Sequence, residues 1–177
     1  MRFIRRSLYP SAAAVLFAAL LLAVFLGSDA SSFQKEAQAL TLTPLTIETR
    51  GGRKLIFKVG IARSHEELGR GLKHRFSLPA DEGMLFDFGT ETRVGMWMKD
   101  TYISLDMIFI DANGFIVEIV KSTTPLSEET ISPNIDVLAV LEINGGLSDR
   151  MGIRTGDRVV HEVIAKEPVQ SPSVQGG

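Results

Sequence analysis

Short segments in which apolar and polar residues alternate recur from residue 44 to residue 164. A period of two predicts half-buried β-strands, and two of the segments are apolar at both sets of alternate positions, which predicts strands buried on both faces. Turn residues separate the segments at intervals typical of all-β domains. The expected strands are 44–50, 54–61, 84–88, 93–98, 104–110, 115–122, 136–143 and 158–164.

Turn and cap residues make this pattern more specific. Gly51-Gly52 and Asn113-Gly114 each lie between two alternating segments and predict hairpins, the second with both residues at positive φ. Ser64 and Glu67 form a capping box, which predicts a short helix from His65 to Arg70. We therefore expect a mainly β fold, an antiparallel sandwich or partly open barrel of about eight short strands with one or two short helices.

The N-terminus has the pattern of an export signal. Three arginines lie within the first six residues, and the apolar run Ala12–Leu26 follows them. This run has the length of a signal-peptide core and is short for a membrane span. We expect cleavage after Ala30 or Ala39, or else an uncleaved anchor, and in both cases a domain in the periplasm or on the extracellular face. The expected organisation is a signal peptide or anchor at 1–30, a flexible lead-in at 31–43, a single β-rich domain at 44–166 and a disordered tail at 167–177.

Net charge and cysteine content limit the kinds of partner and of chemistry that we expect for this chain. Removing residues 1–30 takes away three arginines and one aspartate, so the net charge moves from −2 to −4. An acidic domain cannot neutralise phosphates, so we expect no nucleic-acid partner. The chain contains no cysteine, which excludes thiol chemistry and iron–sulfur clusters. We expect membrane contact only through the N-terminal segment, if that segment is uncleaved.

Two carboxylates lie inside apolar strands. The strand period places Asp106 on one face with Ile108 and Ile110. Glu142 has a similar position in the expected strand 136–143, where burial is less clearly indicated. A buried carboxylate is either paired or lines a pocket, because an unpaired buried charge is costly. Asp106 could therefore be bonded to a cation or to turn amides, or it could belong to a binding site. The candidate cations are Arg70, Arg75 and Lys99.

Polar residues are also dense beside the only tryptophan, Trp97. An apolar segment is interrupted by Lys99, Asp100 and Thr101. These are either loop residues or part of a small-ligand pocket with an aromatic wall. The nearby Met96 and Met98 carry soft sulfur ligands that suit Cu(I), but methionine commonly fills core gaps. The three histidines make no metal-binding motif, and we predict no metal and no cofactor.

Six motifs together resemble the prokaryotic domain-of-unknown-function family 192. They are GRGLKHR (Gly69–Arg75), LPADEGMLFDF (Leu78–Phe88), MWMKDTYISLDMIFID (Met96–Asp111), NGFIVEI (Asn113–Ile119), VLEINGG (Val140–Gly146) and GIRTGD (Gly152–Asp157). The resemblance covers about Leu45 to Val163 and implies a small, mainly β fold without an established activity. This chain departs from the family pattern at Lys73, Asp100 and Ser104, where methionine, asparagine and proline are usual.

The resemblance also suggests which polar residues form a site. With Trp97 added, the candidate ligand-binding residues are Arg70, Arg75, Asp81, Trp97, Lys99, Asp100, Thr101, Asp106 and Glu142. We expect an exported, non-catalytic module that binds a small molecule or a glycan. One alternative is a hydrolase in which Asp100 and Asp106 act as an acid and base pair. The other is a structural or interaction domain in which the polar residues only secure the fold.

Overall fold

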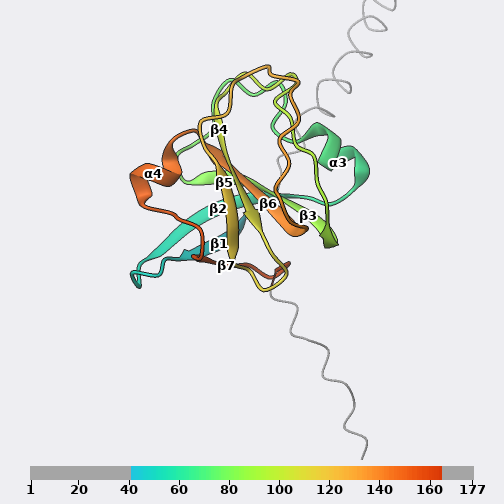
Figure 1. Cartoon of the computed structure of the whole chain (residues 1–177). Coiled ribbons are helices and arrows are strands. Elements are labelled where there is room, and N and C mark those ends of the chain that lie inside the picture. Colours follow the sequence, from blue (N-terminus) through green and yellow to red (C-terminus); the bar gives the residue numbers. More distant parts are fainter. Residues whose placement is uncertain (1–40, 165–177) are drawn as a thin grey trace, which may run out of the picture. The chain divides into compact units, whose positions relative to one another are not determined.

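A computed structural model describes residues 41–164, which belong to one compact unit (Figure 1). The predicted signal segment 1–30, most of the lead-in and the tail 167–177 lie outside the described residues. No helix in residues 41–164 has the length and apolar character needed to cross a membrane. The elements are β1 (Thr43–Glu48), β2 (Lys54–Ala62), α3 (His65–Arg70), β3 (Glu82–Thr92), β4 (Leu105–Ile110), β5 (Ile116–Val120), β6 (Val137–Asn144), α4 (Leu147–Met151) and β7 (Arg158–Val160).

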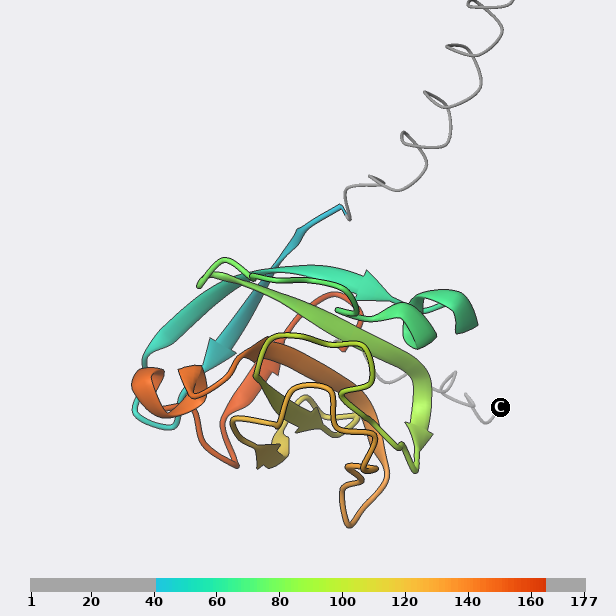
Figure 2. The same cartoon turned by 90° about the horizontal axis from the view of Figure 1, so that it is seen from above.

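The seven described strands form one curled sheet in the order β5-β4-β6-β3-β2-β1-β7. All neighbours are antiparallel except β2 and β3, which run parallel and are connected through α3. Figure 2 shows how the sheet curves around its inner face. A single bridge between Phe115 and Arg158 connects the two edge strands at one end. The partly open barrel is thus confirmed, and the parallel pair is an addition that the strand pattern did not predict.

The sheet has apolar residues on both faces. The inner face packs one cluster that includes Phe57, Leu85 and Ile108. On the outer face, α3 and the neighbouring loops cover a second cluster around Met84, Phe86 and Met107. Every residue of β4 is buried, and so is nearly all of β6. The prediction that these two strands are buried on both faces is confirmed.

The local signals predicted most of the turns and the helix α3, but they did not specify α4. Ser64 and Glu67 form the predicted capping box, and α3 spans the predicted residues. At the second hairpin only Gly114 has a positive φ, so the prediction that Asn113 also has a positive φ is wrong. Instead, the Asp111 carboxylate accepts hydrogen bonds from the amides of Asn113 and Phe115, at 2.9 and 2.8 Å. The side chain closes this turn without a second strained residue.

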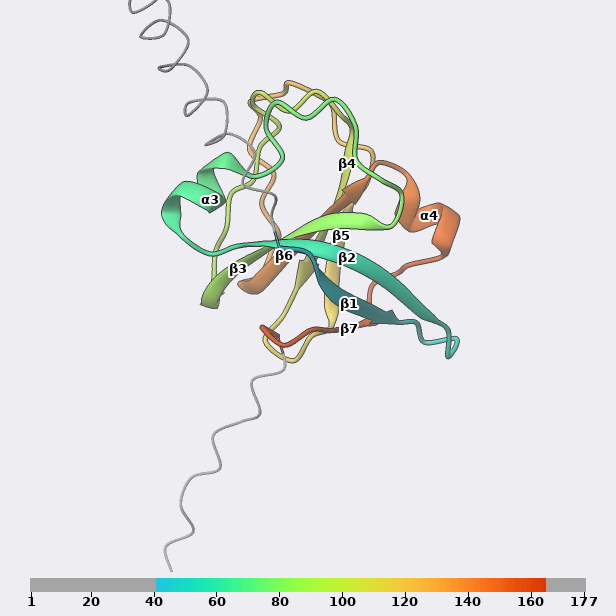
Figure 3. The ribbon, with the colours of Figure 1, turned by 180° about the vertical axis from the view of Figure 1, so that it is seen from behind.

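Three connections gather at one end of the barrel, away from β7, namely 71–81, 95–104 and 121–136 (Figure 3). The strand expected at 93–98 is not formed, because only Met96 pairs there, in an isolated bridge with Ile131. The backbone amide of His74 donates to the carbonyl of Asp100 at 2.8 Å, and that of Leu126 donates to Thr101 at 3.1 Å. These bonds hold the three connections together beside α3.

Candidate functional site

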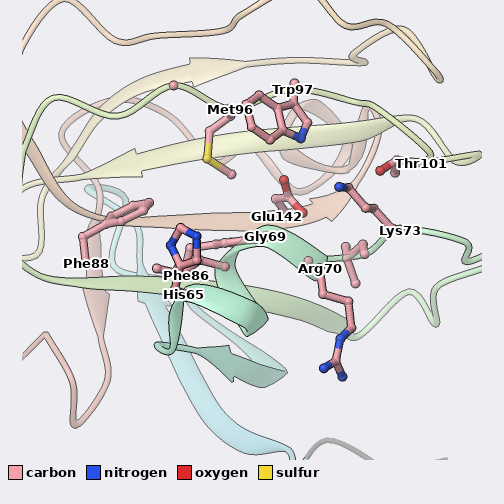
Figure 4. Close-up of a pocket in the computed structure, with 14 residues that line it drawn as sticks. His65, Gly69, Arg70, Lys73, Phe86, Phe88, Met96, Trp97, Thr101 and Glu142 are labelled. Carbon is pink, nitrogen blue, oxygen red and sulfur yellow. The ribbon is translucent and has the colours of Figure 1, made fainter. Parts of the chain in front are cut away.

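A pocket of about 210 Å³ opens between α3, the outer face of β3 and β6, and the 95–104 connection (Figure 4). We call it the α3 pocket. Its walls are mainly aliphatic and aromatic side chains together with three glycines, and its charged groups are few. The lining residues are His65, Leu68, Gly69, Arg70, Gly71, Leu72, Lys73, Phe86, Phe88, Gly95, Met96, Trp97, Thr101 and Glu142.

The carboxyl group of Glu142 points from β6 into this pocket (Figure 4). Its cross-strand neighbours are Met84 on β3 and Met107 on β4, both buried. Glu142 is only 4% exposed, and within residues 41–164 its carboxyl group has no hydrogen-bond or ion-pair partner. Burial raises the pKa of Glu142 to about 8. At neutral pH the group is therefore mainly protonated and can both donate and accept a hydrogen bond.

Trp97 and Lys73 form the mouth of the pocket on two different connections. The indole of Trp97 is half exposed, and the Lys73 ammonium lies 5.9 Å from the centre of its ring, within the range of a cation–π contact. The buried Thr101 follows on the same connection as Trp97, and its hydroxyl donates to the Lys99 carbonyl at 3.4 Å. The mouth thus combines one large aromatic surface with one ammonium group that has no ion-pair partner in the described part of the chain.

Arg70 contributes to the pocket only near the backbone. Its guanidinium points away from Glu142 in Figure 4 and pairs with Glu66 one helical turn earlier. Of the nine residues predicted from the sequence, the α3 pocket therefore contains Arg70, Trp97, Thr101 and Glu142. The charge of Arg70 is directed to the surface of α3.

Asp106 has a different environment from the one expected of a site residue. It is fully buried, and its carboxylate accepts hydrogen bonds from the amides of Ser122 and Gly146, both at 2.7 Å, and of Ser148 at 2.8 Å. Burial alone would raise the pKa of Asp106, but these hydrogen bonds outweigh it and hold the pKa below its ordinary value. The turn-amide alternative is therefore the one observed, and neither arginine nor lysine pairs with this carboxylate.

The remaining four predicted residues lie outside the α3 pocket. Asp81 pairs with Lys58 at 2.9 Å, and Lys99 lies 3.4 Å from a carboxylate oxygen of Glu128. Arg75 is partly buried on the 71–81 connection. Asp100 occupies a left-handed turn at φ 58°, a conformation that asparagine and aspartate tolerate best. This backbone conformation accounts for the asparagine that the family resemblance implies here.

The structure adds pocket residues that the sequence analysis missed. His65 and Leu68 come from α3, Lys73 follows the helix, and Phe86 and Phe88 come from β3. A period of two in the expected strand 84–88 predicts that Met84, Phe86 and Phe88 share one face, and the structure confirms this. No local signal indicated that α3 would lie against that face, because the parallel pairing of β2 and β3 determines its position.

The side chains that could bind a metal ion are not arranged as a metal site in the described residues. Within the described part of the chain, no three histidine or acidic side chains come close enough together to hold a metal ion. Met96 lines the α3 pocket, whereas Met98 is fully buried and accepts a hydrogen bond from the Thr123 hydroxyl at 3.1 Å. The two thioethers therefore have separate surroundings.

Known proteins resemble this chain in sequence and in fold. A crystal structure from Sinorhizobium meliloti 1021, described as a candidate transcription regulator, is 39% identical, with a TM-score of 0.65, over 66% of this chain and 91% of the other. A protein of unknown function from Novosphingobium aromaticivorans DSM 12444 is 34% identical, with a TM-score of 0.68, over 71% and 89% of the two chains. A search of functionally curated proteins finds no match. The family model of domain-of-unknown-function family 192, described as "Uncharacterized ACR", matches residues 46–161, and the chain therefore belongs to this family.

Proposed function

We propose that this protein is an exported, non-catalytic module that binds a small, neutral, hydroxylated molecule in the α3 pocket. The observation that carries the proposal is the buried carboxyl group of Glu142, which lines a largely apolar pocket and has no hydrogen-bond partner among residues 41–164. Burial of such a group costs stability unless it is hydrogen-bonded. A ligand hydroxyl would supply the missing hydrogen bonds, and the Trp97 ring would cover an apolar face of the ligand.

Charge at the pocket favours a neutral ligand. A cationic ligand would approach the ammonium of Lys73, which already lies over Trp97. An anionic group deep in the pocket would lose its hydration among the apolar side chains that surround Glu142. A neutral molecule with several hydroxyl groups avoids both costs and can bond to Lys73 and Glu142 together.

A hydrolase with two carboxylates receives less support. Glycoside hydrolysis of the usual kind needs a pair of carboxyl groups that flank the scissile bond. Glu142 is the one acidic residue among those that line the α3 pocket, and neither Asp100 nor Asp106 belongs to the lining. Asp106 is also occupied by three amides. We therefore do not carry the aspartate pair forward as a catalytic site.

Nucleic-acid binding, suggested by the description of the Sinorhizobium meliloti relative, also receives less support for this chain. Seven of the fourteen lysines and arginines in residues 41–164 are paired with carboxylates, and the expected mature domain has a net charge of −4, which disfavours phosphate binding. These pairs are Lys54–Glu48, Lys58–Asp81, Arg63–Asp87, Arg70–Glu66, Arg93–Asp136, Lys99–Glu128 and Lys121–Asp149.

The single tryptophan gives a direct test of the proposal. Because Trp97 is the only tryptophan in the chain, its fluorescence reports on occupancy of the α3 pocket. We would screen the mature protein against monosaccharides, polyols, amino acids and small carboxylic acids. A hydroxylated ligand should shift the Trp97 emission and raise the Tm, since ligand at 100 times Kd stabilises by about 2.7 kcal/mol.

Two variants separate pocket binding from a general effect. Glu142→Leu should abolish the response while the Tm stays the same or rises, because an apolar side chain of similar size replaces a desolvated acid. Phe115→Ala is the control for binding to exposed aromatic surface elsewhere, since Phe115 is 45% exposed and lies outside the pocket. A wild type that responds to none of these compounds, or a Glu142→Leu variant that still binds, contradicts the proposal.

A further inference from the structure

Two exposed aromatic residues lie beside the mouth of the α3 pocket and have no role in the core. Phe76 is 82% exposed and Tyr102 is 42% exposed. Their rings stack on each other, with centroids 4.9 Å apart and planes inclined by 21°. Exposed aromatic pairs of this kind cost solvation free energy in a monomer and usually indicate a contact surface.

The same two connections that form the pocket mouth carry this pair. Tyr102 directly follows Thr101 of the pocket wall, and Phe76 lies three residues after Lys73. The His74 ring lies 6.1 Å from that of Tyr102, and its backbone amide bonds to the Asp100 carbonyl. Three side-chain pairs thus join the two connections, namely Lys73–Trp97, His74–Tyr102 and Phe76–Tyr102. We call Trp97, Tyr102 and Phe76 the aromatic path.

We infer that the α3 pocket and the aromatic path together bind the end of a glycan chain, with one terminal ring in the pocket and the following rings along the path. This inference rests on the proposed function. The pocket volume of about 210 Å³ suits a single sugar-sized ring, and the pocket is closed below by Glu142. Aromatic rings supply flat apolar surfaces, and His74, Arg75 and Asp100 offer polar groups to the hydroxyl groups at the edges of the chain.

A membrane surface fits the aromatic path less well. Leu126 is exposed and its amide bonds to the Thr101 carbonyl, but the exposed carboxylates of Glu128, which pairs with Lys99, and Glu129 follow it closely in the chain. The charge of Glu129 would be repelled by anionic lipids, and both carboxylates would lose hydration in the interface. A hydroxylated chain tolerates the same carboxylates as hydrogen-bond acceptors.

The test is the dependence of affinity on chain length. The mature protein is titrated with cello-, malto- and chito-oligosaccharides of one to six rings, and Trp97 fluorescence gives Kd for each. For at least one series, affinity should rise about tenfold from one ring to three and then level off. Phe76→Ala should remove most of this gain and leave the one-ring affinity unchanged. Phe115→Ala should alter neither value.

The other outcomes distinguish this inference from the proposed function. If small hydroxylated ligands bind in the pocket but affinity does not rise with chain length in any series, the glycan inference is overturned and the proposed function stands. If no compound alters Trp97 fluorescence, the proposed function fails and the inference fails with it. Loss of vesicle binding to phosphatidylglycerol membranes in Phe76→Ala, together with no oligosaccharide binding, would assign the aromatic path to a membrane.

Discussion

At the scale of single residues, Glu142 and Asp106 show how neighbours decide the role of a carboxyl group. Both lie on buried strands between apolar neighbours, and the two strands are adjacent in the sheet. Asp106 receives three amide hydrogens and is held as a carboxylate. Glu142 receives none among the described residues and is held as a neutral acid. Two similar positions therefore have opposite chemistry.

The raised pKa of Glu142 makes stability depend on pH. Its pKa is 4.5 in the unfolded chain and about 8 in the folded protein. The folded state therefore keeps a proton that the unfolded state has lost, and unfolding releases this proton between these two values. The free energy of unfolding should fall as pH rises through this window, by up to about 1.4 kcal/mol per unit.

The variant Glu142→Gln isolates this contribution. Glutamine resembles the protonated acid, so both proteins should be equally stable below the unfolded pKa of 4.5, and the variant should be the more stable one at pH 9. Chemical denaturation at a series of pH values measures the difference. His65, Arg70 and Lys73 also line the pocket, but they are present in both proteins and cancel. If the free energies of unfolding of the two proteins changed with pH in the same way, this result would contradict the assignment of a neutral Glu142.

At the scale of elements, Asp106 connects β4 to two other parts of the chain. Its carboxylate bonds to Ser122 after β5 and to Gly146 and Ser148 at the start of α4. Asp106→Asn should cost about 2–4 kcal/mol, because the charge is lost and one amide hydrogen faces the new NH₂ group. Thermal or urea unfolding at pH 7 measures this loss.

The lowered pKa of Asp106 also sets the pH range of its contribution. The stabilisation is present above the pKa of the unfolded aspartate and is lost as pH falls through the lower folded value. The loss of unfolding free energy caused by Asp106→Asn should therefore become smaller as pH falls. Asp136→Asn is the matched control, because its pair with Arg93 is exposed and should contribute less than about 1 kcal/mol. An Asp106→Asn protein as stable as this control would contradict the structural role.

The strands could be predicted because their signals are local. Alternation and turn residues specify β1, β2, β4, β5 and β6 within one or two residues at most ends. The parallel pairing of β2 and β3 could not be predicted, since it depends on packing across the sheet. The same limit applies to the site. Glu142 and Asp106 look alike in sequence, and the amides that distinguish them come from residues up to 42 positions away.

At the scale of the whole molecule, we expect the N-terminal segment to direct the domain across the cytoplasmic membrane. Protein recovered from the periplasmic or culture fraction should have the intact mass of a chain that begins after Ala30 or Ala39. Replacing the three arginines Arg2, Arg5 and Arg6 by glutamate should retain the full-length chain in the cytoplasm, because the positive n-region directs insertion. Replacing Lys54 and Lys58 in the domain instead is the control. Recovery of unprocessed wild type in the cytoplasm alone would contradict export.

The parallel alignment of β2 and β3 has a consequence for how binding can diversify within this architecture. The chain must return across the sheet between these strands, and this return segment carries α3 and the aromatic Phe76. Surface connections tolerate changes in length and composition far better than the strands they connect. Relatives can therefore vary the exposed residues of this pocket wall, provided that the buried Leu72 and Leu78 stay apolar and keep covering the outer core cluster. A chimaera that exchanges only residues 63–81 would carry its ligand preference with it.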